Sequence, residues 1–245
     1  MGQRIGAECF YMNFSLVIPL HNEEDNISEL TNVVAKALDD IDIIEDYEII
    51  FVDDGSSDGT YDLLVGLLPT KGQVVRFKKR YGQSAAIAAG LEKACYAVVG
   101  IMDGDMQTDA RDFRVLLQKL AEGYYCVSGI KYPRKESWVK SLYVWLATRV
   151  RKSIFPDSID DLSASMIIFY KNCIAPIFKF DSFHRYIPIL IQMQGYKVLG
   201  FPVTTYKRKA GKSKYGFFNR FLGFFRSLYV LSWMRKNYIS YELKN

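Results

Sequence analysis

Side chains that carry oxygen gather in three short segments, each of which follows a run of apolar and β-branched residues. They are Asp103, Asp105 and Gln107 in one turn, Asp53 and Asp54 in a second, and Glu23 in a third. Two carboxylates at i and i+2 of an exposed turn can point the same way, and an amide oxygen two residues further adds another hard ligand. Such oxygens suit Mg²⁺ or Mn²⁺, which commonly keep waters and bridge to substrate phosphates. The pattern predicts a metal site that neutralises a diphosphate leaving group.

The segment at 53–60 has a second chemical use, because Gly55 and Gly59 permit a tight turn that a ligand can approach closely. Its acids can accept hydrogen bonds from a base or a ribose. Both acidic segments also allow a purely structural interpretation, since acid-rich turns are common and often cap helices. In that case the 103–107 turn caps a helix that starts at Asp109, and Ser57 or Asp58 caps the helix that follows the other segment.

The elements that must position these acids alternate along the first half of the chain. Apolar runs predict strands at 15–19, 47–53, 74–77, 97–102 and 124–129, and helical spacing predicts helices at 24–38, 57–68, 83–97 and 109–120. Such alternation favours right-handed crossovers and a mostly parallel α/β sheet flanked by helices. Ligands of these sheets bind at the carboxyl ends of the strands, so the three acidic segments are expected to meet at one rim.

The second half changes in character, with more aromatic and basic residues. It predicts helices at 138–155, 184–194 and 217–236, strands at 163–170 and 198–203, and a Gly/Lys loop at 207–215. The composition, 49% hydrophobic and 24% charged, is typical of a globular chain. No apolar run reaches the roughly 18 residues that a membrane-spanning helix needs. We expect a disordered leader at 1–12, one domain at 13–215 and a C-terminal amphipathic helix within 216–245.

Together, three motifs resemble the family-2 inverting glycosyltransferases of GT-A fold, a Rossmann-like twisted sheet. They are VIPLHNEE at 17–24, VDDGSSDGT at 52–60 and DGDMQ at 103–107. Two further segments, YGQSAAIAAG at 81–90 and RKAGKSKY at 208–215, are similar to the dolichyl- and polyprenyl-phosphate sugar transferase branch. The resemblance covers about residues 14–215 and agrees with the fold class that the strand and helix pattern predicts.

The resemblance implies roles for particular residues. Asp54 would help hold the nucleotide, in a pocket shaped by Pro19, Glu23 and Asp53, while Asp105 and Gln107 would bind the metal with Asp103 beside them. On the phosphate side the implied residues are Arg208 over the donor or acceptor phosphate, Ser213 and Lys214 in the same loop, Arg134 as a second contact, and Asp161, which matches the acid that opens the next motif. Asp105, Asp161 and Arg208 are the catalytic candidates. Planar guanidinium groups and the point charge of Lys suit phosphate oxygens.

The implied reaction is the metal-dependent transfer of a sugar from a UDP- or GDP-sugar to an undecaprenyl or dolichyl phosphate, with inversion at the anomeric carbon. A phosphate acceptor is ionised at neutral pH and needs little general base. The alternative is a transferase of the same fold that acts on a glycan hydroxyl, which would need a base such as Asp161. The branch usually has Arg-Asn where this chain has Lys79 and Arg80, and Ser-Gly-Phe-Arg where it has ASMI at 164–167. The second departure removes a Gly and an Arg from the acceptor side.

The net charge of +5 and the crowding of Lys and Arg in the second half indicate an anionic partner such as phosphates or an acidic membrane surface. No nucleic-acid recognition motif is present, so nucleic acid is not an expected partner. In the predicted C-terminal helix an apolar arc suits a bilayer interface, although packing against the sheet is the alternative; its members are Phe217, Phe221, Phe224, Phe225, Leu228, Leu231 and Met234. The four cysteines match no metal or redox spacing. We expect a cytoplasmic protein, peripheral at the inner face of the membrane.

Overall fold

The structure is a computed structural model that describes residues 11–132, 145, 148–153, 155, 164–175, 179–206 and 228–237. Five residues that the sequence singles out lie outside the described residues: Arg134, Asp161, Arg208, Ser213 and Lys214. The greater part of the predicted aromatic helix at 217–236 lies outside them too.

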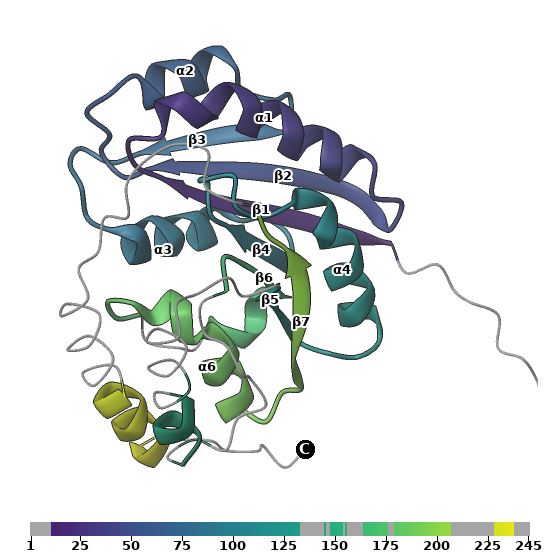
Figure 1. Ribbon diagram of the computed structural model, residues 1–245, viewed down its shortest axis with the longest axis vertical. Coiled ribbons are helices and arrows are strands. Elements are labelled where there is room, and N and C mark those ends of the chain that lie inside the picture. The colour runs from purple at the N-terminus through teal and green to yellow at the C-terminus, as the bar shows by residue number, and fades with distance from the viewer. Residues whose placement is uncertain are drawn as a thin grey trace, which may run out of the picture.

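Seven strands form one sheet in the order β3-β2-β1-β4-β6-β5-β7 (Figure 1). Their bounds are β1 Met12–Leu20, β2 Ile44–Asp53, β3 Gly72–Arg76, β4 Val98–Met102, β5 Cys126–Tyr132, β6 Met166–Tyr170 and β7 Val198–Thr204. The pairs β1–β2, β2–β3, β1–β4 and β5–β7 are parallel, whereas β6 runs antiparallel to both of its neighbours. The predicted mostly parallel α/β sheet is confirmed, with one reversed strand near its middle.

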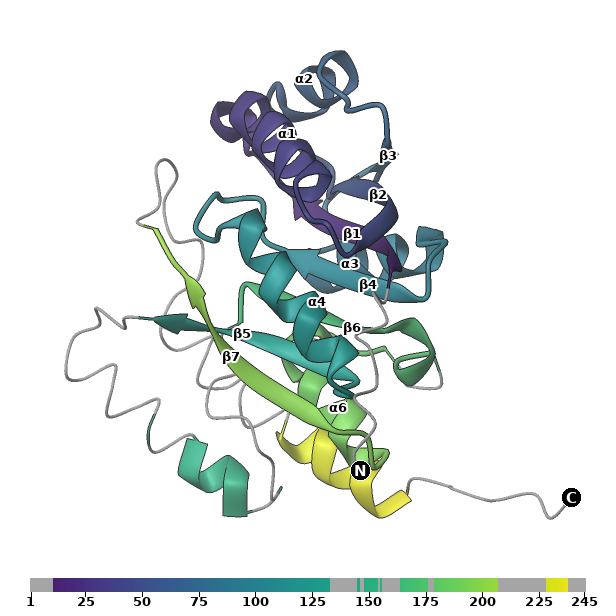
Figure 2. The same cartoon turned by 90° about the vertical axis from the view of Figure 1, so that its right-hand side faces the viewer.

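Helices cover both faces of this sheet (Figure 2). One face carries α1 (Glu24–Asp39), α2 (Thr60–Gly66) and α4 (Phe113–Ala121), and the other carries α3 (Gln83–Lys93) and α6 (Ile187–Met193). Successive strand residues point to opposite faces. Leu16 therefore packs under α1 and Val17 under α3, both with no exposed surface. Burial on both faces explains why the strands are nearly continuous apolar runs.

The start of α2 differs from the sequence prediction. Neither Ser57 nor Asp58 caps this helix, which begins at Thr60 after Gly59 without a side-chain capping bond. Asp58 Oδ1 instead accepts hydrogen bonds from the Thr60 N–H (3.1 Å) and from the Thr60 hydroxyl (2.6 Å). The carboxylate thus closes an Asx-type turn at 58–60, one residue before the N-cap position at Gly59.

The predicted helix at 109–120 is divided into two parts. A 3-10 turn, η1 (Ala110–Asp112), comes first, and α4 follows it. The side chain of Asp109 caps this turn by accepting the Arg111 N–H at 3.0 Å. The cap at this end is thus Asp109 itself, which caps the 3-10 turn, and not the acidic turn at 103–107 that the structural interpretation named.

Residues 228–237 form a helix whose inner side packs against the protein. Leu228 and Leu231 are 4% and 0% exposed and belong to the core on the α6 side of the sheet. The prediction that these two residues face a bilayer is wrong, because they cover apolar surface of this core, as the packing alternative required. Tyr229 and Trp233, one turn apart, are the exposed aromatic residues here. Among the described segments, none forms a helix with the length and apolarity needed to cross a bilayer.

We expect Gly90→Ala to destabilise the fold, because α3 crosses β1 at this glycine. A Cβ at Gly90 would lie 2.3 Å from Val17 Cγ1. Such overpacking costs about 1–3 kcal/mol, which exceeds the gain of up to about 1 kcal/mol in helix propensity. Urea unfolding of the full chain measures the difference.

The matched control is Gly66→Ala in α2, where a Cβ would meet no heavy atom within 4 Å. This change should leave the free energy of unfolding unchanged or raise it by about 0.4–1 kcal/mol. Equal stability of the two variants would contradict the close packing of α3 on β1.

Candidate active site at the carboxyl ends of β1, β2 and β4

The three acidic segments lie at one edge of the sheet, because the strands that precede them are parallel and in register. Leu20 at the end of β1 pairs with Asp53 at the end of β2, and the Asp54 N–H donates to the Leu20 carbonyl at 2.8 Å. On the other side β1 pairs with β4, whose last residue directly precedes Asp103. The structure thus brings together Glu23, Asp53 and Asp103 as the strand pattern predicts. This edge of the sheet, formed by the loops that follow β1, β2 and β4, is called the rim below.

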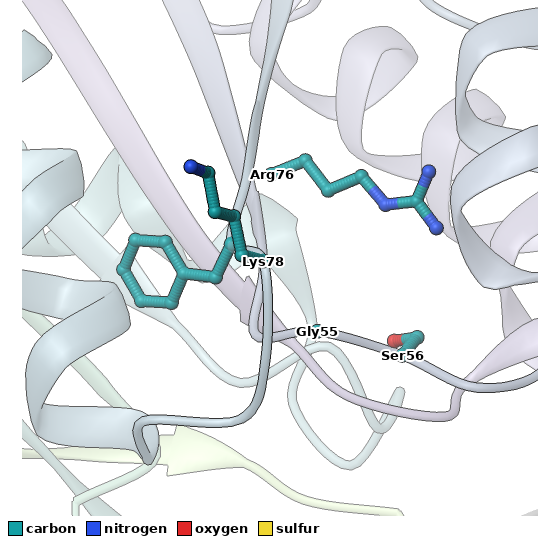
Figure 3. Close-up of a pocket in the computed structure, with 5 residues that line it drawn as sticks. Gly55, Ser56, Arg76 and Lys78 are labelled. Atoms are coloured by element: carbon teal, nitrogen blue, oxygen red, sulfur yellow. The ribbon is translucent and has the colours of Figure 1, made fainter.

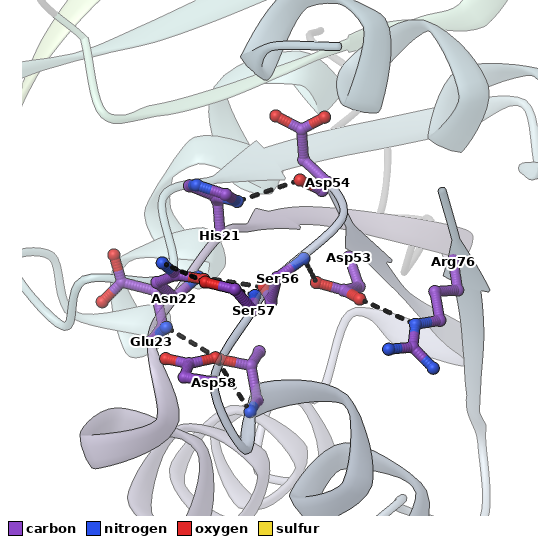
Figure 4. A network of polar contacts seen from close by, with 10 residues as sticks. His21, Asn22, Glu23, Asp53, Asp54, Ser56, Ser57, Asp58 and Arg76 are labelled. Atoms are coloured by element: carbon purple, nitrogen blue, oxygen red, sulfur yellow. Dashed lines mark hydrogen bonds and ion pairs between the residues drawn. The ribbon is translucent and has the colours of Figure 1, made fainter. Parts of the chain in front are cut away.

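Polar contacts join the loop after β1 to the loop after β2 (Figure 4). Asn22, which has a left-handed φ of 52°, donates its N–H to Ser56 Oγ at 2.9 Å and accepts the Ser57 N–H at 2.9 Å. The Glu23 N–H donates to Thr60 Oγ1 at 2.8 Å. Asn tolerates this backbone conformation better than most residues, so its position is part of the junction. These hydrogen bonds join the loop after β1 to the loop after β2.

His21 and Glu23 make further polar contacts, with Asp54 and Asn26 respectively. His21 Nδ1 lies 2.9 Å from the Asp54 carbonyl oxygen. A carbonyl oxygen can only accept, so a hydrogen bond between these two atoms requires the Nδ1–H form of the ring. Glu23 Oε2 accepts a hydrogen bond from Asn26 Nδ2 at 2.8 Å, at the start of α1. Pro19 is partly buried within β1, opposite Val52 of β2.

The carboxylates of Asp53 and Asp54 point in different directions, although the residues are adjacent (Figure 4). Asp53 is fully buried; its Oδ1 accepts the Ser56 N–H at 3.0 Å and its Oδ2 lies 3.4 Å from Arg76 Nε. Asp54 is 3% exposed, and its Oδ1 accepts the N–H groups of Tyr81 (2.6 Å) and Gly82 (3.0 Å). Asp53 therefore holds the end of β3, while Asp54 holds the loop that precedes α3.

Gly55 makes the close packing of these loops feasible. Its φ is +60°, and a Cβ at this position would lie 2.4 Å from the backbone carbonyl carbon of Lys79. A side chain is excluded by the conformation and by the space. The Asp-Asp-Gly turn consequently rests directly on the backbone that leads into α3.

An open pocket of about 360 Å³ lies beside this turn (Figure 3). Gly55, Ser56, Arg76, Phe77 and Lys78 line it. The Arg76 guanidinium also lies 3.9 Å from the centroid of the Tyr61 ring, a cation–π contact. The pocket combines cationic donors and an aromatic ring next to the buried Asp53 carboxylate, a chemistry suited to a nucleotide. Asp53 and Asp54 adjoin this lining without being part of it.

The turn at 103–107 is shaped by its glycine and by Met106. A Cβ on Gly104 would lie 2.2 Å from Leu20 Cδ2, so a larger residue here would require the Leu20 side chain at the end of β1 to move. Met106 has a left-handed φ of 57°. Asp103 Oδ1 accepts a hydrogen bond from Gln83 Nε2 at 2.8 Å, and Asp105 Oδ1 accepts the Gln107 N–H at 3.2 Å. All three acidic and amide side chains of the turn are half-buried.

The oxygen atoms of this turn could hold Mg²⁺ or Mn²⁺. A carboxylate has about four lone-pair positions, so accepting a hydrogen bond does not prevent it from binding a metal ion. Within the described ranges no group of three or more His, Cys, Asp or Glu side chains could hold a metal ion. Mg²⁺ is usually bound by one or two carboxylates together with substrate phosphates.

The loop after the turn is attached to the end of β7. The Gln107 carbonyl accepts the Tyr206 N–H at 2.9 Å, and Asp112 Oδ2 accepts the Thr204 N–H at 2.6 Å. Asp109 Oδ2 accepts hydrogen bonds from the Tyr206 hydroxyl (2.8 Å) and from Arg111 Nη2 (2.6 Å). The chain therefore leaves β7 beside the turn that carries Asp105.

Arg111 and Tyr206 also set the charge state of Asp109. The Arg111 hydrogen bond lowers the pKa of Asp109 to about 2, helped by Tyr206, whereas burial acts in the opposite direction. At Asp58, burial raises the pKa, but the hydrogen bonds from Thr60 and Glu24 outweigh it and the net direction is downward. Both carboxylates are ionised at neutral pH, which keeps the loops around the rim in their hydrogen-bonded form.

Comparison with known proteins decides the family. The sequence profile of Glycosyl transferase family 2 matches residues 15–186. The chain belongs to this family. It is therefore a glycosyltransferase, and the family-2 resemblance of its three motifs is confirmed.

Two curated relatives carry the same name, undecaprenyl-phosphate 4-deoxy-4-formamido-L-arabinose transferase. The protein of Enterobacter sp. (strain 638) is 29% identical over 206 residues, which are 83% of this chain and 62% of that protein. The protein of Edwardsiella ictaluri (strain 93-146) is 29% identical over 205 residues, with 82% and 62% covered. This glycosyltransferase thus spans about 62% of the length of either relative.

Solved structures agree with the GT-A fold. The mannosyltransferase PcManGT from Pyrobaculum calidifontis, in complex with GDP-Man and Mn²⁺, superposes with a TM-score of 0.65 at 19% identity, covering 96% of this chain and 66% of that one. Glucosyl-3-phosphoglycerate synthase from Mycobacterium tuberculosis, with Mn²⁺, UDP and phosphoglyceric acid, gives 0.65 at 14% identity, covering 94% and 80%. At such identities the similarity establishes the fold alone.

Sequence reasoning missed several residues of this rim. Arg76 was recognisable only as part of a basic cluster, although it ends the strand that follows the Asp-Asp motif. Gln83 was recognisable as part of a family segment but not as the partner of Asp103, and no role was assigned to His21. The position of Gln83 at the start of the helix after β3 was the available signal. The contacts of Asp103 and His21 cross 20 and 33 residues of sequence, which no local pattern reveals.

We expect Asp109→Asn to lower the free energy of unfolding by about 1–2 kcal/mol at pH 7, after discounting for the exposure of Arg111. The pKa of Asp109 falls from 3.8 to about 2 in the folded state. The stabilisation that ionised Asp109 contributes is therefore complete above its pKa in the unfolded chain. It is lost as the pH falls through the lower pKa of Asp109 in the folded protein. Urea unfolding should show about half of the difference at pH 3.

The control is Asp62→Asn on the exposed side of α2, which should change the stability by less than about 0.5 kcal/mol at either pH. If the deficit of Asp109→Asn were the same at pH 7 and pH 3, the proposed ion-pair origin would be wrong.

Proposed function

We propose that this family-2 glycosyltransferase moves a sugar from a UDP- or GDP-sugar to a polyprenyl monophosphate, in a metal-dependent, inverting reaction. One observation carries the proposal. Asp54 and Asp103 bind the same short stretch of chain, at Tyr81–Gly82 and at Gln83 respectively. The acid expected to hold the nucleotide and the acid expected beside the metal are thus fixed relative to each other, as the transfer of a nucleotide-linked sugar requires.

On the donor side, the chain supplies acceptors for the nucleotide and ligands for the leaving diphosphate. Asp54 retains acceptor capacity beyond its backbone contacts, in a rim shaped by Pro19, Glu23 and Asp53. Asp105 and Gln107, with Asp103 beside them, would hold Mg²⁺ or Mn²⁺. The bound ion supplies positive charge to the leaving diphosphate. The complexes of PcManGT with GDP-Man and Mn²⁺ and of the mycobacterial synthase with Mn²⁺ and UDP support this assignment.

On the acceptor side, basic residues would hold an ionised phosphate for in-line attack on the anomeric carbon, which inverts its configuration. Arg208, Ser213 and Lys214 follow β7, whose end is attached to the loop of Gln107, and Arg134 follows β5. Asp161 would act only if the acceptor were a hydroxyl that must lose a proton. The printed name of the two relatives, an undecaprenyl-phosphate transferase, supports the lipid phosphate.

A glycan hydroxyl is the second candidate acceptor, favoured by one observation. Where the polyprenyl-phosphate branch has Arg, this chain has Ile167, which lies inside β6 and is 6% exposed. One expected phosphate contact is therefore absent at this position. In that case Asp161 becomes the proposed general base.

A lipid-linked acceptor would place the enzyme at the inner face of the cytoplasmic membrane as a peripheral protein. Exposed aromatic side chains support this part of the proposal: Tyr229 is 74%, Trp233 58% and Trp145 54% exposed. Arg149 lies 4.9 Å from the Trp145 ring centroid, a pairing of charge and aromatic surface that suits a headgroup region.

The test uses the full chain with Mn²⁺, radiolabelled UDP- and GDP-sugars, and one acceptor at a time: undecaprenyl phosphate, dolichyl phosphate or a glycan. We expect label in the organic-solvent extract with one class of donor. Asp105→Ala should reduce the rate by about 100-fold or more, as loss of a group that stabilises developing charge does. The exposed Asp62→Ala in α2 serves as the matched carboxylate control and should transfer at the wild-type rate.

Label that appears on a glycan acceptor and with neither polyprenyl phosphate would establish the second candidate. A normal rate for Asp105→Ala would refute the metal role of that residue.

A further inference from the structure

The first turn of α3 lies between the two acids of the rim and makes a contact that the proposed chemistry does not yet use. Gln83, the first residue of α3, donates its side-chain amide N–H to Asp103 Oδ1 at 2.8 Å. Gly82 precedes it with a φ of 97°, and the Gly82 N–H is bound by Asp54. Asp54, after β2, thus binds the backbone of this turn, and Asp103, after β4, binds its first side chain.

The next residue, Ser84, joins this turn to the segment before α6. Ser84 Oγ accepts the Ser182 N–H at 2.8 Å, lies 3.1 Å from His184 Nδ1 and lies 3.4 Å from Asp181 Oδ1. Ser182 has a left-handed φ of 69°, a conformation that a serine adopts only where its surroundings impose it. The start of α3 is therefore held by the segment before α6 as well as by Asp54.

The Ser84–His184 contact has the chemistry of a support rather than of a nucleophile and its base. Burial lowers the pKa of His184 to about 3, with a smaller contribution from the Arg185 charge. A ring of such low basicity takes up a proton poorly, and Ser84 Oγ is already an acceptor for a backbone N–H. The imidazole is neutral at physiological pH and serves as a fixed hydrogen-bonding partner.

We propose that Gln83 is a positioning residue for Asp103, and that Ser84 and His184 hold Gln83 in place. The inference rests on the proposed function, in which Asp103 lies beside the metal. Fixing one carboxylate oxygen through an amide orients the other, and partners of this kind typically change metal affinity or activity by 10–100-fold when they are removed.

The residue type at position 83 agrees with this role. An amide donates a hydrogen bond without adding charge, so Asp103 keeps its full negative charge for a cation. A lysine would neutralise that charge by pairing with it, and a glutamate would repel it. Asparagine carries the same donor on a side chain one methylene shorter, and leucine or methionine carries no N–H donor at all.

The test is the affinity of the full chain for Mn²⁺, measured from the electron paramagnetic resonance signal of free Mn²⁺ with saturating UDP or GDP. Gln83→Ala should raise the Kd of Mn²⁺ by about 10–100-fold. The control is Gln73→Ala, which removes a bond of the same kind: Gln73 Nε2 donates to Glu48 Oε2 at 2.8 Å, near the other end of the sheet. Gln73→Ala should bind Mn²⁺ as the wild type does.

A second pair of variants tests the support. His184→Leu should weaken Mn²⁺ binding by about 3–10-fold, because Ser84 loses a partner, and His184→Asn should restore most of it, since Asn can place a polar atom near the position of Nδ1. Circular dichroism establishes that each variant is folded at the temperature of the titration.

Three outcomes would overturn the inference. Wild-type Mn²⁺ binding by Gln83→Ala refutes the positioning role and leaves the proposed function standing. Equal binding by His184→Leu and His184→Asn refutes the support by His184. Absence of Mn²⁺ binding by the wild type with both nucleotides refutes the proposed metal site, and the inference fails with it.

Discussion

The rim of this glycosyltransferase depends on one buried carboxylate, that of Asp54. Asp54 directly follows β2, and its carboxylate accepts the backbone N–H groups of Tyr81 and Gly82 at 2.6 and 3.0 Å. Hydrogen bonds to an ionised acceptor are stronger than neutral ones, and loss of this acceptor would leave N–H groups without partners. Because the loop before α3 is fixed in this way, α3 begins where Gln83 reaches Asp103. The proposed nucleotide site and the proposed metal site are thus connected through the first turn of α3.

Two glycines allow the turns after β2 and β4 to pack closely against their neighbours. Gly55 lets the turn after β2 lie against the backbone of Lys79, and Gly104 lets the turn after β4 lie against Leu20. A Cβ at position 55 is excluded by backbone atoms, and a Cβ at position 104 would require the Leu20 side chain to move. Close backbone packing therefore brings the acids of three strand ends together on the sheet itself. The loops that follow β1 and β2 also hold each other through hydrogen bonds, as the contacts of Asn22 with Ser56 and Ser57 illustrate.

Much of this could be predicted from the sequence, because parallel strands place their carboxyl ends at one edge. Apolar runs predicted the strands that precede Asp53 and Asp103, and the spacing of Ile27, Leu30 and Val34 predicted α1. The Asx turn of Asp58 was missed, since a carboxylate two residues before Thr60 can fold its own loop instead of capping a helix. The contact of Ser84 with His184 was also missed, because it crosses 100 residues and depends on how α3 and the segment before α6 pack. The burial of Leu228 and Leu231 was one of two alternatives, and only their place in the core on the α6 side of the sheet distinguishes them.

The central claim is that this rim binds a nucleoside diphosphate together with a divalent metal. The most direct measurement is thermal unfolding of the full chain with UDP or GDP, each with and without Mn²⁺. A ligand at a hundred times its dissociation constant stabilises a fold by roughly 2.7 kcal/mol. We predict stabilisation of this size by one of the two nucleotides, and only when Mn²⁺ is present. An unfolding temperature that neither nucleotide raises, with or without Mn²⁺, would contradict the claim.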